Sequence, residues 1–121
     1  CAKKALANGI TVGLGTDTAC PFVTHYDMWR ELVYFKKFVG VSNAFALHTA
    51  TQVNAKIAGI ENETGSVEVG KSADLLITDA SPLDDLTALR TPYMVVMKGK
   101  TIKQPKVKKF DYVETELDKL L

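Results

Sequence analysis

The sequence is poor in cysteine and histidine, carries almost no net charge and contains no long apolar run. Two cysteines, Cys1 and Cys20, give no disulfide framework, so we expect a reduced, cytoplasmic protein with no bridge between them. A net charge of +1 excludes strong electrostatic recruitment to nucleic acid or to an anionic membrane. No apolar run approaches the ~18 residues that span a bilayer, and no signal peptide is recognisable.

Motifs for nucleotides and for structural zinc are also incomplete. Gly13-Leu14-Gly15 begins like a dinucleotide fingerprint, but Thr18 stands where the third glycine belongs. Gly70-Lys71-Ser72 ends like a P-loop, yet the stretch from Gly65 resembles a strand and no helix is expected to follow. Paired zinc ligands are missing too, because only Cys20 and His25 stand close enough in sequence to form a pair.

What the sequence does contain is an ordinary globular composition, 46% hydrophobic and 24% charged, in 121 residues. That length fits one domain or a piece of a larger one. Cys1 in place of an initiator Met is compatible with a fragment.

The first half reads as helical around one short strand. Gly9 suits the position after a helix end over 1–8, and the apolar run Ile10–Leu14 predicts a strand. After a loop over 16–27, helical spacing and cap residues predict three helices, namely Met28–Val39, Asn43–Thr49 with Ser42 as its cap, and Gln52–Ala58 with Thr51 as its cap. His48 lies inside this pattern, where packing or capping is its expected role.

The second half reads as a small antiparallel sheet followed by a helix. We expect strands at Gly65–Lys71 and Ala73–Asp79, a turn at Ser81–Asp85, and a hairpin of Tyr93–Met97 with Thr101–Ile102. Asp111 is expected to cap a last helix whose apolar face combines Val113, Leu117, Leu120 and Leu121. Five lysines between Lys100 and Lys109 indicate a solvated edge, with an anion site as the alternative.

Asp17 is the most informative candidate for chemistry. It follows the predicted strand Ile10–Leu14, and in parallel α/β folds catalytic groups stand at the carboxyl ends of strands. His25 lies in the loop that follows, on the side from which a substrate would approach. Each has an ordinary alternative, since Asp17 could be a turn or cap residue and His25 part of the loop structure. The aromatic cluster Phe22, Tyr26 and Trp29 could likewise be core or a pocket wall.

Four stretches, taken in order, resemble the C-terminal third of the amidohydrolase superfamily of metal-dependent hydrolases, with imidazolonepropionase-like and prolidase-like members the most similar. They are Gly13–Asp17, Ala50–Lys56, Gly65–Leu75 and Met97–Lys100. The third, of the form G-S-x-E-x-G-K-x-A-D-L, is the most specific. Beyond Lys103 the resemblance is weak.

The resemblance implies an α/β fold, a C-terminal fragment of a (β/α)8 barrel plus the C-terminal share of a small β-sandwich. Residues 1–60 would end the barrel, 61–104 would belong to the sandwich with Asp74 as a structural residue, and 105–121 would form a C-terminal extension. Asp17 would correspond to the family's carboxylate after the eighth strand, which touches the metal and shuttles a proton to the leaving amine. His25 would be a substrate contact.

The resemblance also sets a limit on this chain. The family's other metal ligands are histidines and a lysine or glutamate on earlier strands, and neither His25 nor His48 stands at those positions. We therefore expect a divalent metal, zinc above all, only in a longer parent that cleaves an amide, a cyclic amide or a dipeptide. The chain alone should be inactive and without tightly bound metal.

A non-catalytic role is the competing hypothesis. A barrel strand without its neighbours leaves open edges and apolar helix faces, and such surfaces drive pairing. On this view the chain is an α+β packing or association module, and the isolated chain self-associates.

Overall fold

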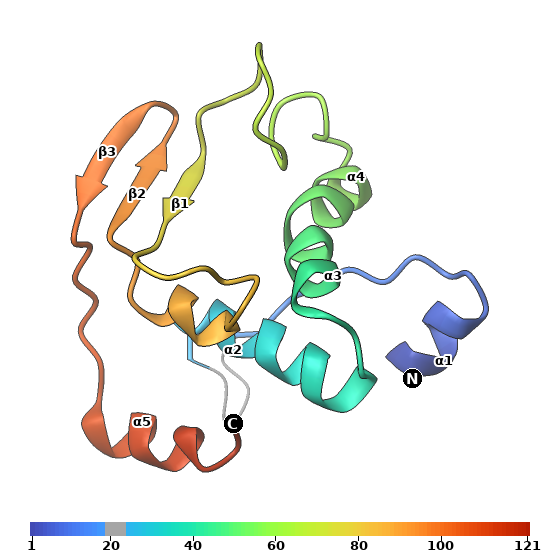
Figure 1. Cartoon of the computed structure of the whole chain (residues 1–121), viewed down its shortest axis with the longest axis horizontal. Coiled ribbons are helices and arrows are strands. Elements are labelled where there is room, and N and C mark those ends of the chain that lie inside the picture. The colour runs from blue at the N-terminus through green and yellow to red at the C-terminus, as the bar shows by residue number, and fades with distance from the viewer. Residues whose placement is uncertain (19–23) are drawn as a thin grey trace.

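A computed structural model describes residues 1–18 and 24–121, with helices in the first half and a small sheet in the second (Figure 1). Cys20, Pro21 and Phe22 lie outside the described residues, and with them the predictions about a Cys1–Cys20 bridge and part of the aromatic cluster. Helix α1 (Ala2–Ala7) ends before Gly9, whose φ of +71° is the left-handed conformation expected there.

The predicted helix Met28–Val39 is confirmed. It begins as α2 (Met28–Tyr34), continues as a π-helical segment, η1 (Phe35–Val39), and ends at Gly40. Gly40 has φ +84°, a conformation that glycine adopts without steric cost.

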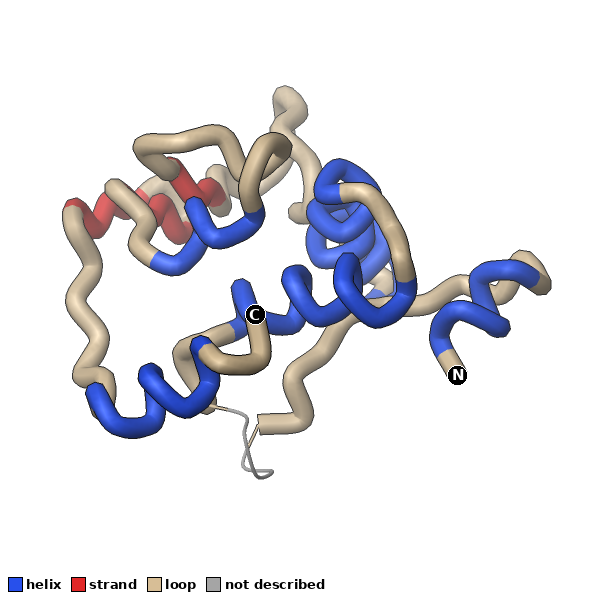
Figure 2. Tube along the Cα trace, turned by 60° about the horizontal axis from the view of Figure 1, so that its bottom comes forward, coloured by secondary structure: helices blue, strands red, loops and turns tan. Residues whose placement is uncertain are grey.

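The next helix is longer than the sequence predicted. The segments α3 (Asn43–His48), η2 (Thr49–Val53) and α4 (Asn54–Ala58) follow one another without a break (Figure 2). Ser42 caps its start as predicted, because its hydroxyl accepts from the Phe45 amide at 3.1 Å. The predicted break at Thr51 is wrong, since the Thr51 hydroxyl donates to the Leu47 carbonyl from within the helix.

Two predicted strands are absent from the described residues. Ile10–Leu14 pairs with no neighbouring strand, as expected for a segment whose partners would have to come from elsewhere. Residues 65–71 form bends and turns instead, because Gly65 and Gly70 have φ of +94° and +95°. Val67 and Val69, which made the pattern look strand-like, are fully exposed. The element that follows Gly70-Lys71-Ser72 is a strand, whereas a P-loop is followed by a helix. This agrees with the sequence analysis, which excluded a P-loop.

The sheet contains three antiparallel strands in the order β1 (Leu75–Ile77), β2 (Met94–Met97) and β3 (Lys100–Lys103). The predicted hairpin is confirmed, with Lys98 and Gly99 both at positive φ as a tight two-residue turn requires. Asp74 has the structural role that was predicted. Its carboxylate accepts from the Lys98 amide at 2.8 Å and from the Thr64 hydroxyl at 3.2 Å.

Two shorter elements complete the fold. A 3-10 helix, η3 (Leu86–Arg90), is capped by Asp85 after the predicted turn. The last helix, α5 (Asp111–Asp118), begins with Asp111 as its first residue, so the prediction that Asp111 is its cap is wrong. Leu117 is buried, but Leu120 and Leu121 lie past the helix end and are 45% and 36% exposed, so the predicted apolar face is shorter than expected.

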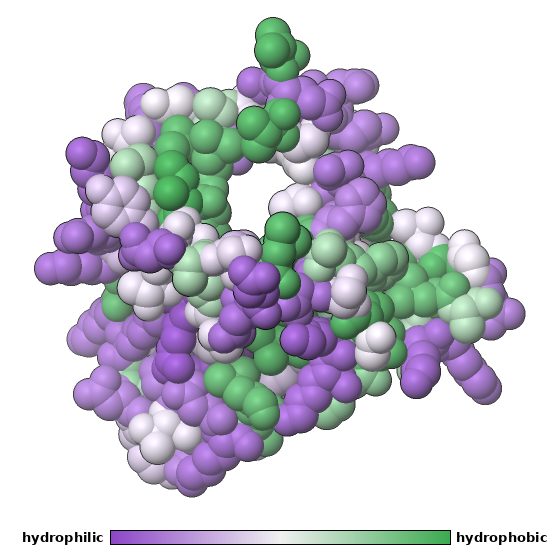
Figure 3. Space-filling model, viewed as in Figure 1, coloured by the Kyte–Doolittle hydropathy of each residue, from purple (hydrophilic) through white to green (hydrophobic). Residues whose placement is uncertain are grey.

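The core is small and lies where α2 meets α3 and η3. Its fully buried apolar residues are Leu32, Phe35, Ala46 and Leu86. Between this core and the sheet is an apolar cleft of about 660 Å³, visible as an opening in Figure 3. Among its lining residues are Trp29, Leu47, Leu76 and Val95. The helices and the sheet therefore do not close onto each other. In the part of the chain that is described, no helix is both long and apolar enough to cross a membrane.

Candidate active-site segment

The segment that leads to Asp17 is held by a helix side chain instead of by neighbouring strands. The Leu14 amide donates to Asn54 Oδ1 at 2.9 Å, and Asn54 Nδ2 donates to the Leu14 carbonyl at 2.8 Å. A Cβ added to Gly13 would lie 2.8 Å from Asn54 Oδ1 and 2.9 Å from Ile57 Cδ1. A larger residue at position 13 would therefore displace the Asn54 or Ile57 side chain. The Asn54 side chain thus satisfies both backbone groups of Leu14, as a neighbouring strand would. It holds the chain three residues before Asp17.

Asp17 lies at the end of this segment and is exposed. Its φ of +47° is in the left-handed region, which aspartate tolerates better than most residues. The residues before and after it, Thr16 and Thr18, share a hydrogen bond between their hydroxyls at 2.7 Å. The proposed catalytic and metal-binding role of Asp17 stays a prediction.

His25 is also exposed and belongs to the same connection between α1 and α2. Its ring meets the edge of Tyr26, with centroids 5.1 Å apart. Its role as a substrate contact stays a prediction as well. His48 is the last residue of α3 and is exposed, so the packing role expected for it is wrong.

A complete metal site is not formed by the described residues. Among them, no group of three or more His, Cys, Asp and Glu side chains could hold an ion. Catalytic metals in proteins normally take three or more protein ligands. The residues that the structure describes therefore do not fit a resident metal by themselves, and Asp17 could supply only one of several ligands.

A buried polar network that the sequence did not reveal begins at Asp27, the residue before α2. Its carboxylate is almost fully buried and accepts three side-chain hydrogen bonds. The donors are Thr24 Oγ1 at 2.7 Å, the Trp29 indole at 2.9 Å and Arg30 Nε at 3.2 Å. Asp27 thus ties the end of the connection to the first turn of α2.

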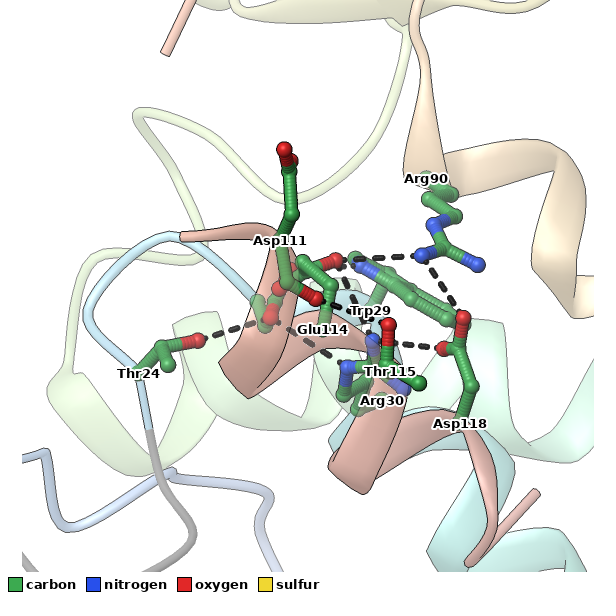
Figure 4. A network of polar contacts seen from close by, with 9 residues as sticks. Thr24, Trp29, Arg30, Arg90, Asp111, Glu114, Thr115 and Asp118 are labelled. Carbon is green, nitrogen blue, oxygen red and sulfur yellow. Dashed lines mark hydrogen bonds and ion pairs between the residues drawn. The ribbon is translucent and has the colours of Figure 1, made fainter. Parts of the chain in front are cut away.

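Arg30 extends the network to the C-terminal helix (Figure 4). This buried guanidinium pairs through Nη2 with Glu114 at 3.2 Å and Asp118 at 2.8 Å. Arg90 reaches the same two carboxylates from η3, at 3.1 and 3.0 Å. Both guanidinium groups also lie over the Trp29 ring, at 4.5 and 5.4 Å from its centroid, in cation–π geometry.

The network changes the acidity of its members. Burial raises the pKa of Asp27, but hydrogen bonding with Thr24, Glu114, Trp29 and Arg30 outweighs burial, and the pKa lies below its ordinary value. For Asp118, burial again acts upward, while hydrogen bonds from Arg30 and Arg90 bring the pKa below its ordinary value. Both carboxylates are therefore held in the charged form, which is what the ion pairs need.

Comparison with known proteins places this geometry in a family. Residues 2–102 match the model of the amidohydrolase family. A crystal structure of a proposed prolidase from Bifidobacterium longum superposes with a TM-score of 0.93 and 48% identity, over 98% of this chain and 29% of that one. A Xaa-Pro dipeptidase with bound methionine in its active site superposes with a TM-score of 0.76 and 32% identity, over 84% and 24%.

A curated relative from Teredinibacter turnerae carries a different name. It is a 5-methylthioadenosine/S-adenosylhomocysteine deaminase, 36% identical over an alignment of 93 positions that covers 69% of this chain and 21% of the relative. The chain thus spans about a fifth of the length of that relative. Because the family model matches residues 2–102 of 121, the chain belongs to the amidohydrolase family.

Proposed function

We propose that this chain is the C-terminal segment of a longer hydrolase that cleaves a carbon–nitrogen bond. The observation that carries the proposal is the 48% identity to a proposed prolidase, maintained over 98% of the chain with a TM-score of 0.93. The chain matches only 29% of that protein, which supports a parent with a larger catalytic domain. Residues 1–60 would end the barrel of that domain, 61–104 would contribute to its β-sandwich, and 105–121 would be an extension.

Asp17 is the residue of this chain to which we assign the chemistry. Its carboxylate is exposed at the end of a segment fixed by Asn54, so it can face a substrate without itself moving. A carboxylate in this position can accept a proton from the attacking water and return it to the departing nitrogen. His25 lies in the same connection and would contact the substrate.

The parent would hold one or two divalent ions, with zinc the most natural choice. When bound, such an ion supplies a water whose pKa is lowered towards ~7. Asp17 would be one ligand, and the others must come from parts of the parent outside this chain. The two cysteines of this chain give no disulfide framework, which supports a reduced, cytoplasmic setting.

The substrate we favour is a dipeptide or another small amide. Both structural relatives described above carry peptidase names. The first is more identical to this chain than the deaminase is, and both cover a larger share of this chain than the deaminase does. Deamination of a nucleoside-like base is the second candidate, supported by the 36% identity to the Teredinibacter turnerae relative. The two reactions share the hydrolysis of a carbon–nitrogen bond and differ in the leaving group.

Metal removal tests the proposal. Dialysis of the full-length protein against a chelator is expected to abolish hydrolysis of Xaa-Pro dipeptides, and zinc should restore it. The chain of 121 residues should retain no ion in the same treatment. The measurement is release of the amino acid, run beside ammonia release from adenosine derivatives, with metal content by mass spectrometry. Full activity after complete metal removal, or neither reaction in the metal-loaded protein, would reject the proposed function.

Self-association of the isolated chain is a separate expectation, and it belongs to the non-catalytic alternative as well. Apolar side chains remain exposed on several elements, including Phe38 and Ile57, and the apolar cleft of about 660 Å³ is open. We expect light scattering at increasing concentration to give a mass above 13.2 kDa for the isolated chain. A monomer at every concentration would count against this expectation.

A further inference from the structure

The C-terminal helix contacts the connection that carries His25, although it lies beyond the part of the chain that matches the family model. That match ends at residue 102, whereas α5 begins at Asp111. Figure 4 shows α5 beside the start of α2, with Glu114 and Asp118 turned towards Arg30. The helix therefore packs against the first turn of α2, directly after the turn Thr24–Asp27.

Two independent contacts link this C-terminal region to the turn Thr24–Asp27. In the first, Glu114 and Asp118 hold Arg30, and Arg30 holds the same Asp27 oxygen that accepts from Thr24. In the second, the Lys109 ammonium lies 5.8 Å from the centroid of the Tyr26 ring. Tyr26 is in turn in edge contact with His25. The turn is thus contacted at Asp27 by the ion-pair network and at Tyr26 by Lys109.

We propose that α5 is a positioning element for the turn Thr24–Asp27, acting through Glu114 and Asp118 on Arg30 and through Arg30 on Asp27. The chain of contacts has little freedom, because the Arg30 and Asp27 side chains are 3% and 2% exposed and Glu114 is 10% exposed. Charge-assisted hydrogen bonds between buried groups fix both direction and distance. A displacement of Glu114 must therefore be transmitted to Asp27 and to the turn.

The catalytic consequence of this inference rests on the proposed function. If His25 contacts the substrate, Glu114 is a positioning residue that affects substrate binding without touching the substrate. Its loss should raise KM and leave kcat nearly unchanged. The structural part of the inference, that α5 holds the turn, does not depend on catalysis.

The variant Glu114→Gln tests the inference in the full-length protein, with Glu116→Gln as the matched control. Both changes remove one carboxylate from α5, but Glu116 is on the exposed side and pairs only with Lys119 among the described contacts. Amide hydrogen exchange of a peptide covering residues 24–30 is the first measurement. We expect exchange about tenfold faster in Glu114→Gln and unchanged in Glu116→Gln.

Dipeptide kinetics are the second measurement. We expect KM to rise about tenfold in Glu114→Gln with kcat within a factor of two, and both constants to be unchanged in Glu116→Gln. Asp118→Asn, which alters the more exposed edge of the same network, should give a smaller change in the same direction and serves if Glu114→Gln does not fold. Equal exchange in Glu114→Gln and Glu116→Gln would overturn the inference, whereas faster exchange with unchanged KM would support the structural part and overturn the catalytic consequence. An inactive wild-type protein would instead reject the proposed function, while exchange would still decide whether α5 holds the turn.

Discussion

Replacing Asp17 with asparagine in the full-length protein is expected to lower kcat by about three orders of magnitude. Proton transfer by a positioned side chain contributes ~10²–10⁴-fold to the rate, and an amide cannot accept the proton of the attacking water. Asparagine has the same shape as aspartate and also tolerates the left-handed conformation, which Asp17 adopts with φ +47°. The loss of kcat in Asp17→Asn would therefore report on the chemistry of the carboxylate. An alanine at this position would add backbone strain, and the two effects could not be separated. The measurement is kcat at saturating dipeptide and zinc.

Asp79→Asn is the matched control. Asp79 is an exposed aspartate in the bend after β1, far along the chain from the candidate segment. The same change of charge there should alter kcat by less than a factor of two. If Asp17→Asn retained more than about a tenth of the wild-type kcat, the proton-transfer role of Asp17 would have to be abandoned.

The elements that could be predicted from the sequence are those whose signals are local. Gly40 and Gly59 end helices in the left-handed conformation, and Ser42 caps a helix with its own side chain. Lys98 and Gly99 form a hairpin turn between two short strands, so no distant residue is needed to specify it. In each case the residues that determine the structure are neighbours in the sequence.

The errors in the sequence analysis have physical causes. A strand at Ile10–Leu14 requires partner strands, and within the described residues the chain supplies only the side chain of Asn54. Thr51 has the residue type of a cap, but its hydroxyl bonds back to Leu47 and the helix continues through it. The valines of 65–71 alternate like those of a strand, yet the bends at Gly65 and Gly70 turn the chain before a strand can form.

The candidate site was predictable only in part. Asp17 could be singled out because it follows an apolar run and because of the family resemblance. Asn54 stood inside a motif that the resemblance used, but its contact with Leu14 crosses 40 residues and no local pattern indicates it. The link from Arg30 to Glu114 crosses 84 residues. Glu114 and Asp118 are four residues apart on one helix face, and this spacing does not indicate their partner.

Removal of the Arg30 guanidinium is expected to cause the largest loss of stability. In Arg30→Met, the Asp27 and Glu114 carboxylates would remain buried, and only Arg90 would still pair with Glu114. Removing one partner from a buried ion pair costs about 3–5 kcal/mol, because the remaining charge is left uncompensated. Arg30→Lys keeps the charge but loses the planar fork, so its cost should be smaller. The measurement is urea denaturation of the full-length protein followed by circular dichroism.

Lys119→Met is the matched control for Arg30→Met, because it removes one positive charge from an exposed pair with Glu116. Such pairs contribute about 0–1 kcal/mol, so its denaturation midpoint should barely move. A double variant that adds Glu114→Leu to Arg30→Met separates lost packing from stranded charge. If uncompensated charge causes the loss, removing Glu114 as well should recover part of the stability, since apolar residues of similar volume replace buried ion pairs at little cost. If the double variant is less stable than Arg30→Met, the network stabilises the protein chiefly by the contacts that its side chains make, and Glu114 contributes to the docking of α5 even without Arg30.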